Sequence, residues 1–256
     1  MSAFMSAFAS LVGALADLLH PLFQNASTAA AIVLFTALVR LAVHPLSRAA
    51  ARGQKAQRRL QPQIAALRKK HAKNPERMQK ALMELHREEK VSPLSGCLPS
   101  LLQMPAFFLL YHLFSSTRIG GDANELLGHQ LFGAPLGERW RDAVADGGPL
   151  GTQGLVYAGL FVIVAAVATF NYGRTKRQMA ANPVTPATGP DGQPVPGMGT
   201  MTKVMPLMSF FTLFTVAFVP LAAALYVVTS TTWTAVERAF LYRDQPTAGP
   251  AVATTA

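Results

Sequence analysis

The stretch Ser27–Leu46 reads STAAAIVLFTALVRLAVHPL and carries one formal charge, Arg40. A helix needs about 20 mostly apolar residues to cross a bilayer, and an ionisable group inside such a helix marks a candidate functional site. On insertion scales a central Arg costs about 3 kcal/mol, whereas each Leu, Ile, Phe or Val contributes about 0.5 kcal/mol in favour of insertion. Because eight such side chains lie between Ile32 and Val43, we expect this helix to insert with little margin.

Arg40 has two interpretations. Its guanidinium could snorkel toward Leu46, where a basic segment begins, or it could face a polar cavity inside a helix bundle. Six residues of helix span about 9 Å, so the guanidinium reaches the interface only at full extension. We therefore favour the polar cavity.

The composition is that of an integral membrane protein. Of 256 residues, 50% are hydrophobic and 14% charged, and the mean hydropathy is +0.26; soluble domains average about 25% charged residues. The single cysteine, Cys97, excludes an intramolecular disulfide. The six histidines form no i,i+4 pair and no cluster with the cysteine, and the chain has no P-loop and no G-x-S-x-G sequence. We expect no metal, no cofactor and no enzymatic activity.

Residues 1–26 contain no Lys or Arg and one acidic residue, Asp17. Apolar residues at helical spacing predict a helix that lies at the outer membrane interface. A sixth membrane span is the alternative, but Asp17, His20 and Pro21 interrupt it. A secretory signal would need a basic region that is missing here.

Residues 47–92 hold thirteen of the 23 basic residues and only four acidic ones, for a net charge of +9. Two short apolar repeats flank Asn74-Pro75, which predicts a turn with Pro75 near a helix start. Pro62 should kink or delay the first arm. The prediction is a cytoplasmic antiparallel helical hairpin, since inner loops of membrane proteins are basic. No aromatic or Gly-rich interleaving favours binding of a specific nucleic-acid sequence. The basic residues singled out on its surface are Arg58, Arg59, Lys69 and Lys70.

Four further apolar runs complete the predicted topology. Pro220 divides the last, uncharged tract into two spans. The acidic segment between the second and third spans belongs outside, and the Pro/Gly-rich linker after the third span belongs inside. The fold class is an all-α integral membrane protein of five transmembrane helices, with the N-terminus outside and the C-terminus in the cytoplasm. The predicted segments are 1–26 (outer interfacial), 27–46 (first span), 47–92 (hairpin), 93–117 (second span), 118–152 (outer loop), 153–173 (third span), 174–203 (linker), 204–219 (fourth span), 221–242 (fifth span) and 243–256 (disordered tail).

Several of these segments resemble the YidC/Oxa1/Alb3 membrane protein insertases. The matching pieces are TALVRLAVHPLSR around Arg40, LQPQIAALRKKH in the hairpin, VSPLSGCLPSLLQMPAFFLLY in the second span, TKRQM after the third, and LYVVTSTTW with FLYR in the fifth. They occur in the family's order between about residues 27 and 243. The low-Lys, Ala-rich composition is similar to that of the actinobacterial type.

The resemblance implies a helix bundle with a hydrophilic groove that is open to lipid and cytoplasm and closed outside. It also implies a bacterial inner membrane protein that inserts and helps fold nascent membrane proteins, alone or with the Sec translocon. Ribosomes and anionic lipids are the further expected partners. Positions matching the family's groove are Thr36, Arg40 and Tyr226. Additional polar lining is expected from Gln103, Ser230 and Thr231.

Two other functions stay open. A small secondary transporter could bind an anionic substrate at Arg40, but such transporters usually contain internal repeats, and none is found here. A scaffold that docks ribosomes through the basic hairpin would not require Arg40 at all.

Overall fold

The structure is a computed structural model that describes residues 2–71, 74–89, 91, 108, 111–119, 121–181 and 204–241. The chain divides into two compact units. The first comprises Met1–His44, Leu102–Phe170 and Met208–Val236, and the second comprises Pro45–Leu101, Asn171–Leu207 and Glu237–Ala256.

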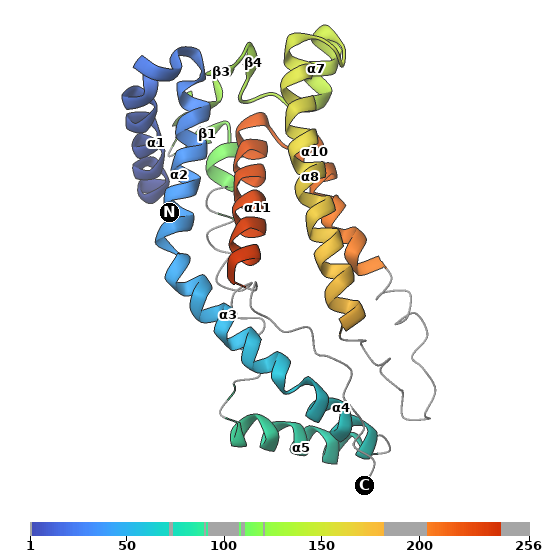
Figure 1. Ribbon diagram of the computed structural model, residues 1–256. Coiled ribbons are helices and arrows are strands. Elements are labelled where there is room, and N and C mark those ends of the chain that lie inside the picture. The colour runs from blue at the N-terminus through green and yellow to red at the C-terminus, as the bar shows by residue number, and fades with distance from the viewer. Residues whose placement is uncertain are drawn as a thin grey trace. The chain divides into compact units, whose positions relative to one another are not determined.

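Helices make up most of the described chain, which confirms the all-α prediction (Figure 1). In chain order the elements are α1 Ser2–Phe23, η1 Gln24–Ala26, α2 Ser27–Ala42, α3 His44–Arg59, α4 Gln61–Lys70, α5 Pro75–Glu88, β1 Arg118–Ile119, β2 Asp122–Ala123, η3 Glu125–Leu127, β3 Gln130–Leu131, β4 Ala134–Pro135, α7 Trp140–Gly147, α8 Thr152–Ala181, η4 Met205–Phe210, α10 Phe211–Phe218 and α11 Leu221–Leu241.

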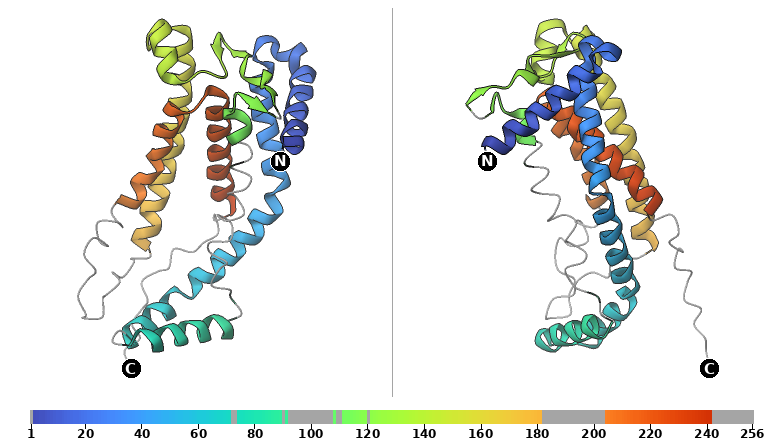
Figure 2. Two further views of the ribbon diagram at one scale, coloured as in Figure 1. Left: turned by 180° about the vertical axis from the view of Figure 1, so that it is seen from behind. Right: turned by 90° about the vertical axis from the view of Figure 1, so that its left-hand side faces the viewer.

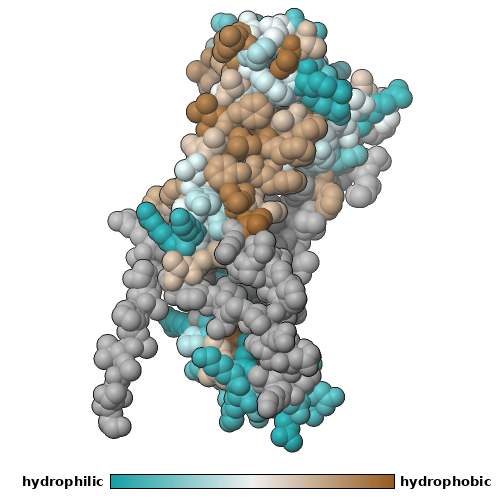
Figure 3. Space-filling view, turned by 90° about the vertical axis from the view of Figure 1, so that its right-hand side faces the viewer, coloured by the Kyte–Doolittle hydropathy of each residue, from teal (hydrophilic) through white to brown (hydrophobic). Residues whose placement is uncertain are grey.

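Two stretches of the described chain are long and apolar enough to cross a membrane, judged by length and composition. They are Ser6–Ala42, which joins α1, η1 and α2, and Thr152–Ala180 within α8. Met205–Phe218 is a shorter apolar helix. Large apolar side chains are exposed on α8 and α10, and Figure 3 shows a continuous apolar area on one face of the molecule. Such exposure is unusual in a soluble monomer and fits a lipid environment.

The helices of the basic hairpin, α3, α4 and α5 (Figures 1 and 2), begin and end where local signals predict. Asn74 caps α5, since its side-chain Oδ1 accepts a hydrogen bond from the Arg77 main-chain N–H at 3.0 Å, and Pro75 occupies the first turn. This confirms the predicted turn. The first arm breaks at Leu60, and Pro62 lies in the first turn of α4, as predicted.

The predicted turn at Pro220 is also confirmed, because α10 ends at Phe218 and α11 begins at Leu221. By contrast, α8 continues past residue 173 to Ala181. The first strong helix breaker after the third span is Pro183, which disfavours helix only at the residue before it. The first part of the predicted linker is therefore helical.

The predicted outer loop contains ordered structure that the sequence did not indicate. Strand β1 pairs antiparallel with β2, and β3 pairs antiparallel with β4. The two residues between β3 and β4, Phe132 and Gly133, have φ values of 49° and 83°. Positive φ at both central positions is the geometry of the tight turn that matches the twist of paired strands. Helix α7 follows these hairpins.

Candidate functional site

Arg40 lies near the end of α2, and its side chain reaches α11. The Nη2 atom of Arg40 donates a hydrogen bond to the Oγ atom of Ser230. The Arg40 side chain is half-buried, and Ser230 is buried. Two residues that the sequence analysis placed in one groove are therefore brought into direct contact.

Thr36 and Tyr226 lie one turn away from this pair on their respective helices, and both are almost fully buried. The Thr36 hydroxyl donates to the Ile32 carbonyl at 2.7 Å, so it is satisfied within its own helix. The Tyr226 side chain lies one helical turn before Ser230, on the same side of α11, and its ring lies 6.2 Å from that of Phe114. Arg40, Ser230 and Tyr226 thus form one polar cluster in an otherwise apolar region.

Two further residues, Thr231 and Gln103, were predicted to line the groove. Thr231 is half-buried on α11, and its hydroxyl oxygen lies 2.8 Å from the Val227 carbonyl oxygen and 3.1 Å from that of Val228. The Thr231 hydroxyl is therefore satisfied within its own helix. Gln103 lies outside the described residues.

The predicted basic residues of the hairpin all fall on α3 and α4. Arg59, Lys69 and Lys70 are exposed at helix ends. Arg58 lies within α3, and its side chain is outside the described part. The three described side chains can meet an anionic partner.

Sequence reasoning missed two buried polar atoms within three residues of Ser230 on α11. Thr232 Oγ1 and Trp233 Nε1 are buried on α11, and neither has a hydrogen-bond partner in the described part of the chain. Buried polar groups are normally paired, so unpaired ones call for an explanation such as a missing ligand or water. The signal was present, because Thr229–Thr234 reads TSTTWT, a polar run inside an apolar span.

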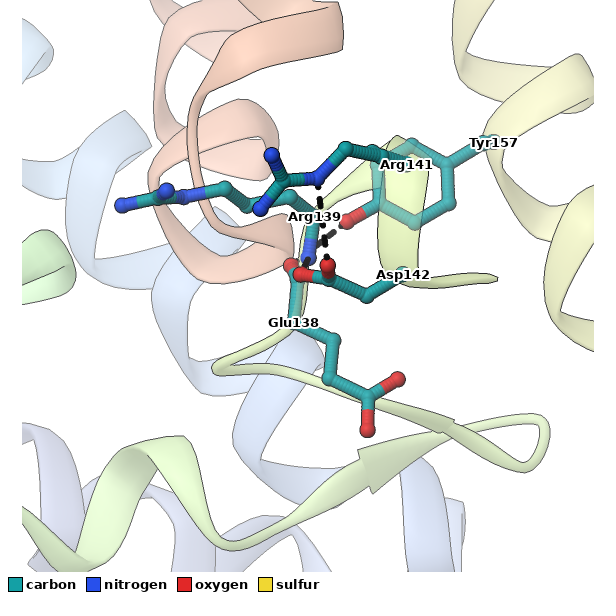
Figure 4. A network of polar contacts seen from close by, with 5 residues as sticks. All are labelled: Glu138, Arg139, Arg141, Asp142 and Tyr157. Atoms are coloured by element: carbon teal, nitrogen blue, oxygen red, sulfur yellow. Dashed lines mark hydrogen bonds and ion pairs between the residues drawn. The ribbon is translucent and has the colours of Figure 1, made fainter. Parts of the chain in front are cut away.

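The start of α11 is fastened to the segment before α7. The main-chain N–H groups of Leu221 and Ala222 donate to the carbonyls of Glu138 and Leu136, both at 2.9 Å. The Tyr157 hydroxyl, on α8, donates to the same Glu138 carbonyl at 2.6 Å (Figure 4). The Leu136–Glu138 backbone therefore joins α8 to α11.

Beside this junction, Figure 4 shows a small charged network. The Arg139 main-chain N–H donates to the Asp142 carboxylate at 3.2 Å, and Arg141 Nε lies 3.6 Å from that carboxylate. The Glu138 side chain points away from these partners. Burial raises the pKa of the Glu138 carboxyl, and the carboxylates of Asp146 and Asp142 raise this pKa further.

We expect Glu138→Gln to raise the melting temperature at pH 7.5 and to change it little at pH 4. A carboxyl whose pKa is raised in the folded state is tolerated best below its ordinary pKa of 4.5, and the fold loses stability as the pH rises through the higher folded value. The neutral amide avoids this loss. Thermal unfolding in detergent at both pH values, with exposed Glu125→Gln as the control, measures the effect. An equal shift at both pH values would contradict this explanation.

Among the described residues, no group of three or more His, Cys, Asp or Glu side chains is arranged to hold a metal ion. The cluster offers instead a guanidinium and two hydroxyls, with the unpaired Thr232 hydroxyl and Trp233 indole N–H close by along α11. Such groups can bind anionic or carbonyl-bearing segments but do not resemble a nucleophile with its activating base.

Comparison with known proteins gives a family. Residues 18–248 match the family described as "60Kd inner membrane protein". A protein of Streptomyces avermitilis named "Membrane protein insertase YidC" is 28% identical over 227 residues, which cover 85% of this chain and 52% of that protein.

Two relatives match shorter stretches of this chain at higher sequence identity. Proteins of the same name from Clostridium perfringens and Azotobacter vinelandii are 48% identical over 84 residues and 39% identical over 97 residues. These matches cover 33% and 38% of this chain, and 35% and 17% of the two relatives. The matches thus span about half, or less, of the length of these curated relatives.

Proposed function

This chain belongs to the 60Kd inner membrane protein family, the YidC/Oxa1 family that its sequence resembles, and from that premise we propose that it is a membrane protein insertase of the bacterial inner membrane. It receives nascent membrane proteins from the cytoplasmic side and releases their apolar segments into lipid. No covalent bond is made or broken, so the activity is not enzymatic.

The observation that carries this proposal is the contact between Arg40 and Ser230. A charge inside a membrane helix is costly and is usually held by a polar partner that faces a cavity or the bundle interior. Here the guanidinium points to a hydroxyl on another helix, which supports the polar cavity over the snorkelling alternative. We propose that Arg40, Ser230, Tyr226 and Thr36 line a hydrophilic groove, and that Gln103 and Thr231 add to it.

The first eight residues of α11 support closure of this groove on the outer side. All eight residues from Leu221 to Val228 are buried, and three of them are the alanines 222–224. Small residues let membrane helices approach closely. Eight residues correspond to about 12 Å of helix, against a hydrocarbon thickness of about 30 Å. A polar substrate segment that reaches Arg40 would then cross only this shorter apolar seal.

The mechanism follows from these two parts. An acidic or polar outer segment of a substrate cannot enter hydrocarbon alone. Arg40 stabilises its negative charge within the groove, and the apolar helix that follows moves laterally into lipid. Translocation of the polar segment across the seal then completes insertion, alone or with the Sec translocon.

We further propose the five-span bundle, with the N-terminus outside and the hairpin and C-terminus in the cytoplasm. Cysteines placed at two exposed helical alanines test this orientation in a background where Cys97 is serine. Ala145→Cys, in α7, should react with an impermeant maleimide in intact cells, and Ala66→Cys, in α4, should react only after the membrane is opened. The reverse pattern would overturn the topology.

The basic hairpin is proposed to bind ribosomes and anionic lipid headgroups. Replacing Lys69 and Lys70 by Glu lowers the net charge of residues 47–92 from +9 to +5. We expect this variant to bind ribosomes more weakly and with less salt dependence, since exposed charges are screened over about 10 Å at 0.1 M salt. Sedimentation of ribosomes with proteoliposomes at increasing salt measures this, and the Lys→Arg pair should bind like wild type. Equal binding by all three forms would exclude the electrostatic role.

Depletion in cells distinguishes the proposed function from the two alternatives. An insertase predicts that small single-span and double-span proteins fail to insert when this chain is removed. A transporter predicts normal insertion with loss of uptake of one anionic solute. When the depleted cells are supplied with Arg40→Ala, a ribosome-docking scaffold predicts that insertion recovers as fully as with wild type. An insertase predicts that insertion does not recover.

A further inference from the structure

The loop that contains the β3–β4 hairpin is hydrogen-bonded to several helices. The buried Asn124 side-chain amide donates to the carbonyls of Leu113 and Ser116, both at 2.9 Å, where the helix before β1 ends. Tyr157 on α8 and the start of α11 donate to the Leu136–Glu138 backbone, as described above. The loop therefore connects the ends of three helices by hydrogen bonds, and α2 is the fourth.

The attachment of α2 to this loop is a pair of side chains. Thr28, in the first turn of α2, is almost fully buried, and its Oγ1 atom lies 2.6 Å from the Nδ1 atom of His129. His129 is exposed and directly precedes β3, which contacts α2 (Figure 1). The His129 carbonyl accepts from the Leu136 N–H at 2.8 Å, and the Leu136 carbonyl accepts from the Ala222 N–H at 2.9 Å. A short hydrogen-bonded path thus links the start of α2 to the start of α11.

The same two helices also meet directly, because Arg40 on α2 donates to Ser230 on α11. Helix α2 is continuous from Ser27 to Ala42, so a displacement of its first turn is transmitted to Arg40. A helix that is attached to its neighbour at one point can pivot about that point. Attachment at two points fixes both the separation of the two helices and their axial position.

Packing alone specifies the axial position of α2 only weakly. The buried residues at the start of this helix are small, namely Ser27, Thr28, Ala29 and Ala31, and small side chains interdigitate little with their neighbours. Burial of apolar surface is also non-directional. A hydrogen bond, by contrast, requires a defined distance and angle between donor and acceptor. The bond between Thr28 and His129 therefore supplies a positional constraint that the apolar contacts of α2 lack.

We propose that His129 is a positioning residue for Arg40. Its bond to Thr28 fixes α2 relative to α11 and thereby holds the guanidinium of Arg40 beside Ser230, although His129 itself contacts neither of these residues. One consequence rests on the proposed function: insertion of substrates with acidic tails should depend on His129, because those tails use the charge of Arg40, and insertion of neutral tails should not.

A spin-label distance between α2 and α11 tests the positioning role without reference to insertion. The full chain in proteoliposomes, with Cys97 replaced by serine, carries labels at the exposed positions Leu38→Cys and Val236→Cys. We expect a narrow distance distribution with His129, a broader one with His129→Leu, and a narrow one again with His129→Asn, whose amide places a polar atom where Nδ1 lies. Gln130→Leu, at the exposed next residue, is the matched control and should stay narrow. The same distribution in all four proteins would overturn the proposal.

Insertion rates in the same proteoliposomes test whether His129 acts through Arg40. A hydrogen bond of ordinary strength changes an equilibrium about fivefold, so His129→Leu should slow insertion of an acidic tail by up to about fivefold. It should leave a neutral tail unchanged and have no further effect in an Arg40→Ala background, and His129→Asn should restore the rate. Equal slowing of both tails, persisting without Arg40, would indicate a general defect and overturn the proposal.

The two measurements separate this proposal from the proposed function. If Arg40→Ala inserted acidic tails as fast as the parent protein, the groove function would fail. The distance distributions would still decide whether His129 positions α2, because they do not depend on any substrate.

Discussion

Replacing Arg40 with alanine is expected to abolish most insertion of a substrate with a short acidic outer tail. The positive charge compensates the tail's carboxylates where water is scarce, and an interaction of this kind is worth about 2 to 3 kcal/mol at the effective dielectric of a protein groove. A loss of that size lowers the rate roughly thirtyfold to 160-fold. Proteoliposomes that contain only this protein, with a protease-protected reporter, measure the rate at matched protein levels.

Two variants separate the charge of Arg40 from its hydrogen-bond geometry. Arg40→Lys should largely retain activity, because substrate tails differ in sequence and need a positive charge rather than a fixed fork of donors. Ser230→Ala keeps the charge and removes its partner, so it should reduce insertion less than Arg40→Ala does. Reporters with tails of graded acidity should show a growing difference between wild type and Arg40→Ala. Equal insertion by both proteins for every tail would mean that Arg40 only anchors the topology and does not line a groove.

Replacing Ala223 with leucine is the second change with a large expected effect. Ala223 is fully buried in the stretch of α11 that we propose as the outer seal, so a leucine there adds three carbons where no surface is exposed. Overpacking of this kind usually costs about 1 to 3 kcal/mol. We expect a melting temperature lower by several degrees and a leak of small ions through proteoliposomes, since the helices around the seal must separate.

Ala166→Leu provides the matched control for this change. Ala166 is exposed on α8, in a helix that we propose to face lipid, so the same added volume should alter neither stability nor ion leak. If both leucine variants behaved like wild type, the Leu221–Val228 stretch would not be a tightly packed seal.

The sequence predicted those parts of the fold that depend on local signals. Asn74-Pro75 and Pro220 mark helix ends because their effects on the backbone are intrinsic to the residues. The strand pair β3–β4 was not predicted, because its turn places Phe132 at a positive φ, which nothing in a phenylalanine suggests. The sequence does not predict the extension of α8 to Ala181, because Arg174, Lys176 and Arg177 end the apolar run without ending the helix.

The candidate site was predictable to the extent that a single charge stands out in an apolar run. Arg40 is such a charge, and the family resemblance predicts Tyr226 in the same groove, with Ser230 as additional polar lining; of these two, Ser230 accepts a hydrogen bond from Arg40. The unpaired atoms of Thr232 and Trp233 were not foreseen, since whether a buried polar atom finds a partner depends on packing between helices. The bonds from Leu221 and Ala222 to Glu138 and Leu136 join distant parts of the chain and leave no local trace in sequence.

Those two bonds have a consequence for the biogenesis of the protein itself. The first amides of a helix lack partners within it, and at the start of α11 two of them are satisfied by the Leu136–Glu138 backbone. In the proposed topology that backbone lies outside the membrane, and because it is synthesised earlier, it would have to be exported and arranged before α11 docks. If its export is delayed, the emerging helix carries two bare N–H groups into a medium without water, at a cost of several kcal/mol. Docking of α11 therefore acts as a checkpoint that follows successful export of the preceding segment.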